Sequence, residues 1–184
     1  MVDTSKSIAE RCAGIDVLVL DVDGVLTDGG IIYADDGLEL KRFHVRDGSA
    51  LKLWHALGKR TALISGRSSR VVQVRAAELK IESVIQGASD KLVAYRQLLQ
   101  QIEVRPEQVC SVGDDLPDLP LLRNCGFAVA VADACAEAKE DAHHVTRAAG
   151  GRGAVREAIE LILGCQNLWR PAIERLRDQK LCDS

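Results

Sequence analysis

The chain has 184 residues, of which 47% are hydrophobic and 3% aromatic, and its formal net charge is -3. This length suits one domain, residues 1–184, which hides about 70% of its unfolded surface, and the apolar content excludes a disordered chain. The acidic balance, the absence of a basic run and the scarcity of aromatic residues argue against a nucleic-acid partner. No apolar stretch approaches the ~20 residues of a membrane span, so we expect no membrane partner.

The N-terminal segment and the cysteines indicate a cellular compartment. Residues 1–13 carry Asp3, Lys6, Glu10 and Arg11, which does not suit a signal peptide. The cysteines are scattered along the chain without C-x-x-C spacing, which favours reduced thiols over a disulfide framework or a zinc site. We therefore expect a cytoplasmic protein.

Strand-like and helix-like segments alternate along the chain. Short apolar runs predict strands at 15–20, 61–64, 83–86, 109–112, 127–131 and 144–146. Helical patterns lie at 5–12, 47–57, 69–79, 89–102, 116–124, 134–141 and 154–163. We expect Asp47 to cap the helix that runs to Leu57, and Ser89 or Asp90 to open the helix that runs to Ile102. This alternation predicts an α/β fold with a doubly wound, mainly parallel sheet.

Two segments fall outside this alternation. Residues 29–44 contain strand-like pieces on either side of Ala34-Asp35-Asp36-Gly37, which predicts a β-hairpin that could serve as a flap. The tail, residues 167–184, could form a helix starting near Pro171. Whether the tail packs on its own subunit or reaches a neighbour is left open.

Two acidic residues end the first predicted strand. The apolar run 15–20 leads into Asp21 and Asp23, and Gly24 permits a sharp turn there. Ligands of parallel sheets bind beyond the carboxyl ends of the strands. Paired carboxylates can hold a hard dication, or divide their work as nucleophile and proton donor. A turn or helix-cap role explains a single Asp well, but explains this pair less well.

Other strand ends and helix starts carry matching chemistry. Ser65 follows the predicted strand 61–64, and Lys91 lies just inside a helix start. Asp114 follows the strand 109–112. A cap role for the serine or a solvated position for the lysine would be ordinary in isolation. Together these groups would lie at one edge of the sheet, which indicates a functional site. Whether Asp115 or Asp118 also contacts a bound metal ion is left open.

The motifs resemble those of a known superfamily. D-V-D-G-V at 21–25, S-G-R at 65–67, Lys91 and G-D-D-x-x-D at 113–118 resemble, in order and spacing, the four motifs of the haloacid dehalogenase (HAD) superfamily of phosphatases. The resemblance implies a Rossmann-like core. It also implies that Asp21 is the nucleophile, which forms an aspartyl-phosphate, and that Asp23 protonates the leaving oxygen and then activates water.

The same resemblance implies a set of ligands. Mg²⁺ would be held by Asp21, the backbone carbonyl of Asp23 and Asp114. Ser65 and Lys91 would hold the phosphoryl oxygens. These roles agree with physical expectation, because phosphoryl transfer depends mostly on positioning and on charge neutralisation by a dication and an ammonium group.

A narrower resemblance concerns the missing cap. The gap between residues 28 and 65 has room only for the hairpin and one helix, so we expect no cap domain. F-H-V-R-D-G at 43–48, V-G-D-D-L-P-D-L-P at 112–120 and A-G-G-R-G-A-V-R-E at 149–157 resemble the capless 3-deoxy-D-manno-octulosonate 8-phosphate (KDO 8-phosphate) phosphatases. That family implies a homotetramer whose hairpins meet near the fourfold axis and whose subunits help to close each other's sites.

The resemblance also implies the substrate contacts, a list that comprises Asp23, His44, Val45, Arg46, Asp47, Gly48, Lys52, Arg67, Arg75 and Lys91. Two positions depart from the family pattern: His44 is often Asn, and Lys52 is often Arg, whose two-pronged contact a lysine lacks. These contacts include more cationic side chains than one phosphate group requires: Arg46, Lys52, Arg67, Arg75 and Lys91. The excess suits a sugar acid phosphate, which also carries a carboxylate.

The implied function is Mg²⁺-dependent hydrolysis of KDO 8-phosphate in the supply of lipopolysaccharide precursors. The alternatives are a sialic-acid-type 9-phosphate phosphatase of the same build, a capless phosphatase of phosphoproteins or nucleic-acid ends, and a non-catalytic phospho-acceptor module. The segment 150–153 lacks dinucleotide-binding spacing, and we expect it to be a structural turn near the site.

Overall fold

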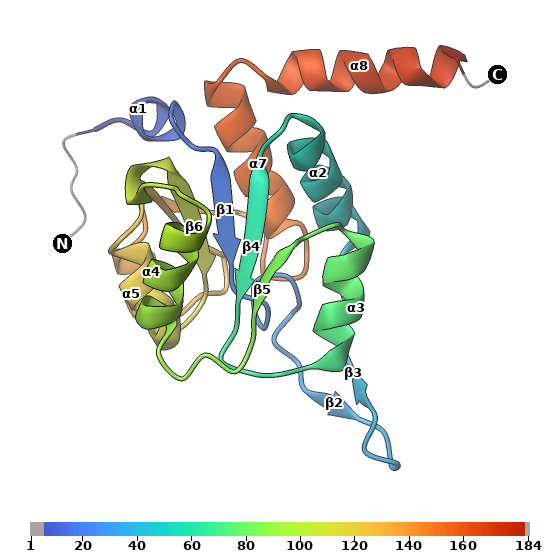
Figure 1. The fold of residues 1–184 in the computed structure, drawn as a ribbon, viewed down its shortest axis with the longest axis vertical. Coiled ribbons are helices and arrows are strands. Elements are labelled where there is room, and N and C mark those ends of the chain that lie inside the picture. The colour runs from blue at the N-terminus through green and yellow to red at the C-terminus, as the bar shows by residue number, and fades with distance from the viewer. Residues whose placement is uncertain (1–5, 183–184) are drawn as a thin grey trace.

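The computed structural model describes residues 6–182 and the side chains of residues 6–175. Its core is a six-stranded sheet in which every paired strand is parallel, in the order β5-β4-β1-β6-β7-β8 (Figure 1). The strands are β1 (Val17–Leu20), β4 (Arg60–Ile64), β5 (Ser83–Ile85), β6 (Val109–Gly113), β7 (Phe127–Ala130) and β8 (His144–Val145). The predicted doubly wound α/β fold is confirmed.

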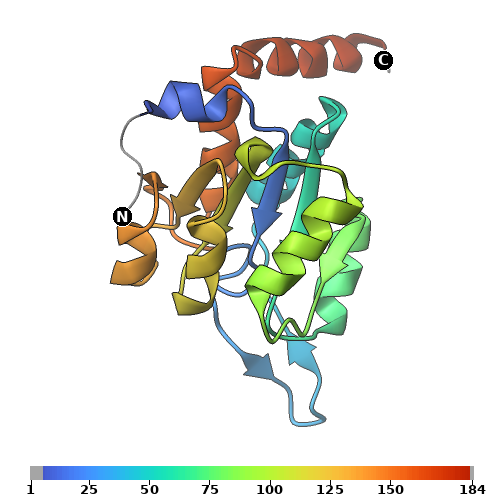
Figure 2. The ribbon, with the colours of Figure 1, turned by 60° about the vertical axis from the view of Figure 1, so that its left-hand side comes forward.

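Helices cover both faces of this sheet (Figures 1 and 2). One face carries α2 (Val45–Ala56), α3 (Arg70–Glu78) and α7 (Ala154–Cys165), and the other carries α4 (Lys91–Gln101) and α5 (Leu119–Leu122). Shorter pieces are α1 (Ile8–Cys12), α6 (Ala136–Glu140), η1 (Pro106–Gln108) and η2 (Leu116–Asp118). None of the helices within residues 6–182 combines the length and apolar character needed to cross a membrane.

The central strand β1 joins the two hydrophobic layers. Leu18 and Leu20 pack into the layer that contains Trp54 of α2, whereas Val17 and Val19 pack into the layer under α4. All four strand residues are fully buried, and burying each such side chain stabilises the fold by about 1.5–3 kcal/mol. Because β1 is buried on both faces, its carboxyl end is held rigidly where the acidic residues follow.

Helix α2 begins two positions earlier than the sequence predicts. We expected Asp47 to cap a helix at 47–57, but α2 starts at Val45. The Asp47 carboxylate instead accepts hydrogen bonds from the backbone N–H groups of Gly153, at 3.2 Å, and Arg156, at 2.7 Å. It therefore caps the N-terminus of α7, a contact between distant parts of the chain that local pattern does not reveal.

The hairpin forms as predicted and projects beyond the carboxyl ends of the strands (Figure 1). Its strands β2 (Ile32–Tyr33) and β3 (Glu39–Leu40) pair antiparallel. The final helix α8 (Trp169–Cys182) lies at the opposite end of the molecule, and it begins two residues before the predicted Pro171 (Figure 2). The described segment between β1 and β4 holds only the hairpin and α2, in agreement with the prediction that no cap is inserted there.

The turn at 150–153 packs against the loop that carries the acidic pair. The Gly151 N–H donates to the carbonyl of Val25 at 2.9 Å. A Cβ atom on Gly150 would lie 1.7 Å from the carbonyl oxygen of Gly24. The predicted structural turn is confirmed, and this contact requires glycine because a larger residue has no room.

Replacing Gly150 with Ala should therefore displace one of the two loops. We expect the free energy of unfolding in urea to fall by at least about 1–3 kcal/mol, as for other overpacked sites. The matched control is Gly164→Ala in α7, where an added Cβ meets nothing within 4 Å. That change should raise stability by roughly 0.5–1 kcal/mol through helix propensity. Equal stability of the two variants would contradict this packing account.

Candidate active site

A cavity of about 230 Å³ opens at the carboxyl ends of the central strands. Its lining residues come from four separate segments that the sheet brings together: Asp21, Asp23, Ser65, Gly66, Arg67, Lys91, Asp114, Asp115, Pro117 and Asp118. Because the lining follows β1, β4 and β6 and includes the start of α4, the four predicted motifs meet at one place.

Asp21 lies directly beyond the end of β1. Its N–H donates to the carbonyl of Val112 at 3.1 Å, which continues the pairing of β1 with β6. Its side chain is buried and accepts a hydrogen bond from Lys91 Nζ at 2.8 Å. Burial, followed by the negative charge of Asp118, raises the pKa of Asp21 to about 6, while Lys91 acts in the opposite direction.

Lys91 is held between two carboxylates. Its Nζ also donates to Asp118 Oδ1 at 2.7 Å. Burial alone would lower the pKa of Lys91, but the charges of Asp21 and then Asp118 raise it overall. The ammonium group therefore stays charged and faces the cavity. Asp90 caps α4 by accepting from Leu92 N at 2.8 Å, which fixes Lys91 at the first position of the helix.

Asp118 stabilises the acidic loop, residues 114–118, which follows β6. Its Oδ2 accepts from the backbone N–H groups of Asp114, at 3.0 Å, and Asp115, at 3.3 Å. Since its other oxygen binds Lys91, both oxygens are engaged within the protein. The structure thus gives Asp118 a supporting position between Lys91 and the loop.

Asp114 has the donor group best suited to a cation. Its Oδ1 is buried without a hydrogen-bond partner among the described residues. Burial, and then the charges of Asp21, Asp118 and Asp115, raise the pKa of Asp114 to about 8. Ligand atoms of Asp21, Asp114 and Asp118 lie within 4.8 Å of one another. Such a set of oxygens with uncompensated negative charge fits a hard dication.

Gly24 makes room for this cluster. It has φ of +95°, and a Cβ there would lie 2.0 Å from Asp114 Oδ2. The turn after Asp23 can therefore press against the Asp114 carboxylate only because position 24 has no side chain.

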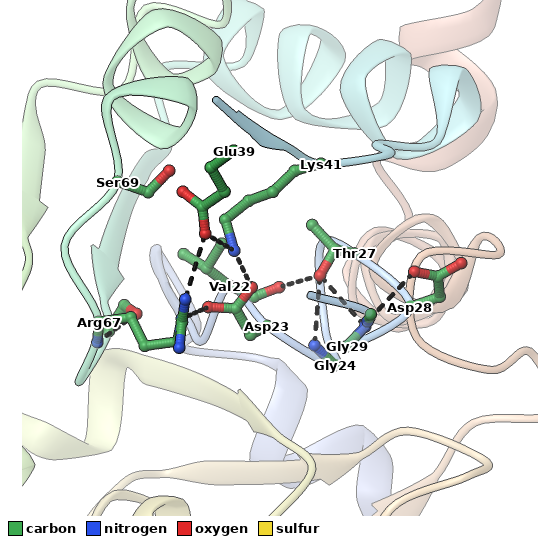
Figure 3. A network of polar contacts seen from close by, with 12 residues as sticks. Val22, Asp23, Gly24, Thr27, Asp28, Gly29, Glu39, Lys41, Arg67 and Ser69 are labelled. Carbon is green, nitrogen blue, oxygen red and sulfur yellow. Dashed lines mark hydrogen bonds and ion pairs between the residues drawn. The ribbon is translucent and has the colours of Figure 1, made fainter. Parts of the chain in front are cut away.

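Asp23 points toward the hairpin (Figure 3). Its Oδ1 accepts a hydrogen bond from Lys41, and its Oδ2 lies 3.7 Å from Arg67 Nε. Glu39 joins the two cations, because its Oε1 lies 3.4 Å from Lys41 Nζ and 3.3 Å from Arg67 Nη2. A hydrogen bond of 3.1 Å from Arg67 to the Tyr33 hydroxyl extends this network along the hairpin.

Ser65 and Arg67 form the turn after β4. The Ser65 hydroxyl oxygen accepts from the Arg67 N–H at 3.1 Å, and the Ser65 side chain is buried at the cavity wall. Arg67 also lines the cavity and keeps 39% of its side chain exposed.

The remaining predicted substrate contacts lie outside this cavity. His44, Val45, Arg46, Asp47 and Gly48 form the start of α2 and the residue before it. Within that stretch, Arg46 lines a different cavity, of about 320 Å³, together with three other arginines: Arg147, Arg152 and Arg156.

Two further predicted contacts lie farther along α2 and α3. Lys52 lines a third cavity, of about 490 Å³, with His55 and Glu78. Arg75 pairs with Glu78 at 2.7 Å and packs over the Phe43 ring. One chain therefore gathers Asp21, Asp23, Ser65, Arg67, Lys91 and Asp114, but does not bring residues 44–48, Lys52 and Arg75 to the same cavity.

Sequence reasoning missed Glu39 and Lys41. Their signal is the alternation Glu39-Leu40-Lys41, which places the two charged residues on one face of an extended segment and the leucine on the other. In the structure these two charged residues contact Asp23 and Arg67 of the site.

Comparisons with known proteins agree with this geometry. A model of haloacid dehalogenase-like hydrolases matches residues 80–159. The 3-deoxy-D-manno-octulosonate 8-phosphate phosphatase KdsC of Yersinia pestis is 46% identical over 163 residues, which cover 89% of this chain and 87% of that protein. The KdsC protein of Escherichia coli K12 is 44% identical over 88% of this chain and 86% of its own length.

A solved structure extends the match to three dimensions. The 3-deoxy-D-manno-octulosonate 8-phosphate phosphatase of Moraxella catarrhalis, in complex with a magnesium ion, a phosphate ion and a KDO molecule, superposes with a TM-score of 0.89. It is 40% identical and covers 92% of this chain and 97% of its own. With its parallel sheet, its four motifs at one edge and these relatives, the chain belongs to the 3-deoxy-D-manno-octulosonate 8-phosphate phosphatase family of haloacid dehalogenase-like hydrolases.

Proposed function

We propose that the protein is a Mg²⁺-dependent phosphatase that hydrolyses KDO 8-phosphate through an aspartyl-phosphate on Asp21. The observation that carries this proposal is the buried contact of Lys91 with Asp21 beside the Asp114 carboxylate. It places a fixed carboxylate, an ammonium group and a cation-binding oxygen around one small cavity. The substrate follows from the relatives, which are named for KDO 8-phosphate and include a complex with phosphate and KDO.

The chemistry proceeds in two steps. An Asp21 carboxylate oxygen attacks the phosphorus, and the bond from phosphorus to the sugar oxygen breaks while Asp23 gives that oxygen a proton. Asp23 then takes a proton from water, which attacks the phosphoryl group and frees Asp21 and inorganic phosphate. Ser65 and Lys91 hold the phosphoryl oxygens throughout. Lys91 offsets the repulsion between the nucleophile and the phosphate dianion.

Asp21, Asp114 and the backbone carbonyl of Asp23 would hold the Mg²⁺ ion. The unpartnered Oδ1 of Asp114 and the gathered carboxylates support this assignment. When bound, the ion supplies positive charge to the phosphoryl oxygens and to the attacking carboxylate. We give Asp115 no ligand role, because its side chain is exposed.

The full site is proposed to form between subunits of a homotetramer. Residues 44–48, Lys52 and Arg75 lie outside the cavity of their own chain. The exposed members of this set, such as Arg46 and Lys52, would therefore reach the sugar acid across a subunit interface, whereas Asp47 is buried and engaged at the start of α7. The hairpin supports such an assembly, because Ile31, Ile32, Tyr33, Leu38 and Leu40 are exposed on it. Exposed apolar patches of this kind mark interaction surfaces.

The cellular setting is part of the same proposal. We place the enzyme in the cytoplasm, in the supply of lipopolysaccharide precursors, acting as one HAD-like domain that spans residues 1–184. The free state of the five cysteines that the structure describes supports a reducing compartment.

The substitution Asp21→Asn should abolish hydrolysis, because an amide is a poor nucleophile toward phosphorus. We expect kcat to fall by at least about 10³-fold, with the fold retained, since Asp118 still pairs with Lys91. The measurement is phosphate release, with far-ultraviolet circular dichroism as the check on folding. Asp35→Asn in the exposed hairpin turn is the matched control and should keep full activity. Full activity of Asp21→Asn would refute the mechanism.

Magnesium should raise the thermal unfolding midpoint of the wild-type protein, because a ligand that binds only the folded state stabilises it. In Asp114→Asn this shift should disappear, and in Asp115→Asn it should persist. The metal-free Asp114→Asn protein should unfold no earlier than the wild type, since the substitution removes repulsion among buried carboxylates. A shift that persists in Asp114→Asn, or vanishes in Asp115→Asn, would contradict the proposed ligand set.

The substrate assignment predicts a preference of at least about tenfold in kcat/KM for KDO 8-phosphate over a sialic-acid-type 9-phosphate. One extra carbon between anchored groups costs about 1–3 kcal/mol, or 10–200-fold. The measurement is steady-state phosphate release from both sugars, with a phosphoserine peptide as a third substrate. The relatives favour the eight-carbon sugar. Preference for the nine-carbon sugar or the peptide would overturn the assignment while leaving the Asp21 chemistry intact.

A further inference from the structure

The hairpin reaches into the site through one side chain, Lys41. Figure 3 shows its long stem passing from the hairpin toward Asp23, and its Nζ donates to Asp23 Oδ1. Only 1% of the Lys41 side chain is exposed. Lysine is seldom buried so fully unless its charge is paired. The contact between Lys41 and Asp23 is therefore part of the packed structure, and Lys41 comes from a segment outside the four motifs.

Glu39 keeps the Lys41 ammonium group in place. Its Oε1 lies 3.4 Å from Lys41 Nζ and also 3.3 Å from Arg67 Nη2. The carboxylate thus ties the hairpin lysine to the turn after β4. With its charge shared between Asp23 and Glu39, the ammonium group has two fixed acceptors.

The two oxygens of Asp23 have different neighbours. Oδ1 is bound by Lys41, whereas Oδ2 lies 3.7 Å from Arg67 Nε, beyond direct hydrogen-bond distance. Asp23 lines the cavity, and the described residues that line it do not include Lys41. Lys41 therefore binds Asp23 Oδ1 from outside the set of lining residues, which leaves Oδ2 as the oxygen available for proton transfer.

We propose that Lys41 is a positioning residue that fixes the side-chain orientation of Asp23 for proton transfer to the leaving oxygen. This inference rests on the proposed function, because it assumes that Asp23 is the proton donor. A donor must stay within hydrogen-bond reach of the leaving oxygen, and a displacement of about 1 Å can cost roughly 10²-fold in rate. The hairpin thus contributes to catalysis through Asp23, in addition to any role in assembly.

The test compares Lys41→Met with Arg42→Met. Methionine keeps much of the apolar stem and removes the charge. Arg42 is the matched control, since it lies next to Lys41 in the same arm of the hairpin and pairs with Asp28 instead of Asp23. Both changes remove one positive charge from the same arm of the hairpin, so an effect of net charge alone appears in both variants.

Each variant is measured in single-turnover experiments with two substrates. KDO 8-phosphate has a poor alkoxide leaving group that needs a proton, whereas p-nitrophenyl phosphate releases a stable phenolate that does not. With the sugar phosphate, Lys41→Met should slow sugar release by about 10–100-fold, a share of the usual general-acid contribution. Nitrophenolate release should change by less than about threefold, and Arg42→Met should resemble the wild type with both substrates.

Steady-state data give a second readout. A positioning role predicts a lower kcat with a nearly unchanged KM for the sugar phosphate. Lys41→Arg, which keeps the charge, should recover part of the lost rate. A rise in KM alone would make Lys41 a substrate ligand and overturn the proposal. Equal losses of rate with both substrates would mean that Lys41 has only a structural role, which contradicts the proposal. An unchanged rate in Lys41→Met would refute the proposal outright.

Failure of the inference can be told apart from failure of the proposed function. If the wild-type protein does not hydrolyse KDO 8-phosphate, the substrate assignment is wrong. The same comparison is then made between p-nitrophenyl phosphate and an alkyl phosphate that the wild type does hydrolyse. A loss confined to the alkyl phosphate would still support the positioning role of Lys41, and a uniform loss would still contradict it.

Discussion

The buried ammonium group of Lys91 between Asp21 and Asp118 is the interaction on which the site depends. An isolated charge in this position would be costly, and burial raises the pKa of Asp21 even with Lys91 beside it. Together the three groups fix the end of β1, the start of α4 and the acidic loop after β6 relative to one another. Asp114 takes no part in these hydrogen bonds through its side chain, and its buried Oδ1 is therefore available to a cation.

The fold supplies this arrangement through close backbone contacts. The parallel sheet brings the ends of β1, β4 and β6 to one edge, where ligands of such sheets bind. Gly24 and Gly150 let two loops approach within distances that no side chain would permit. On the far side of the acidic pair, the hairpin adds Lys41 and Glu39. The phosphoryl-transfer groups are thus supported from the sheet, and the proposed proton donor is supported from the hairpin.

The sequence predicts well what local pattern determines. The strand that ends at Leu20 and the hairpin turn around Gly37 depend on neighbouring residues, and both were placed correctly. For α4, local pattern left the start open between Ser89 and Asp90, and Asp90 is the cap. Asp47 was assigned to the N-terminus of α2, but it caps α7. Its carboxylate oxygens accept hydrogen bonds from the N–H groups of Gly153 and Arg156, which only the tertiary fold brings near. The contact from Lys41 to Asp23 was missed for the same reason. The predicted substrate contacts that lie outside the cavity, such as Arg46 and Lys52, are proposed to act across a subunit interface, which local sequence pattern does not place.

The most direct test of this account is to identify the side chain that carries phosphate during turnover. Protein quenched during hydrolysis is treated with borohydride, which reduces an aspartyl-phosphate to homoserine, and the peptides are then examined by mass spectrometry. The account predicts homoserine at position 21 and at no other aspartate, dependent on both substrate and Mg²⁺. Homoserine at position 114 or 118, or rapid phosphate release with unmodified Asp21 at every quench time, would contradict the central role given to Asp21.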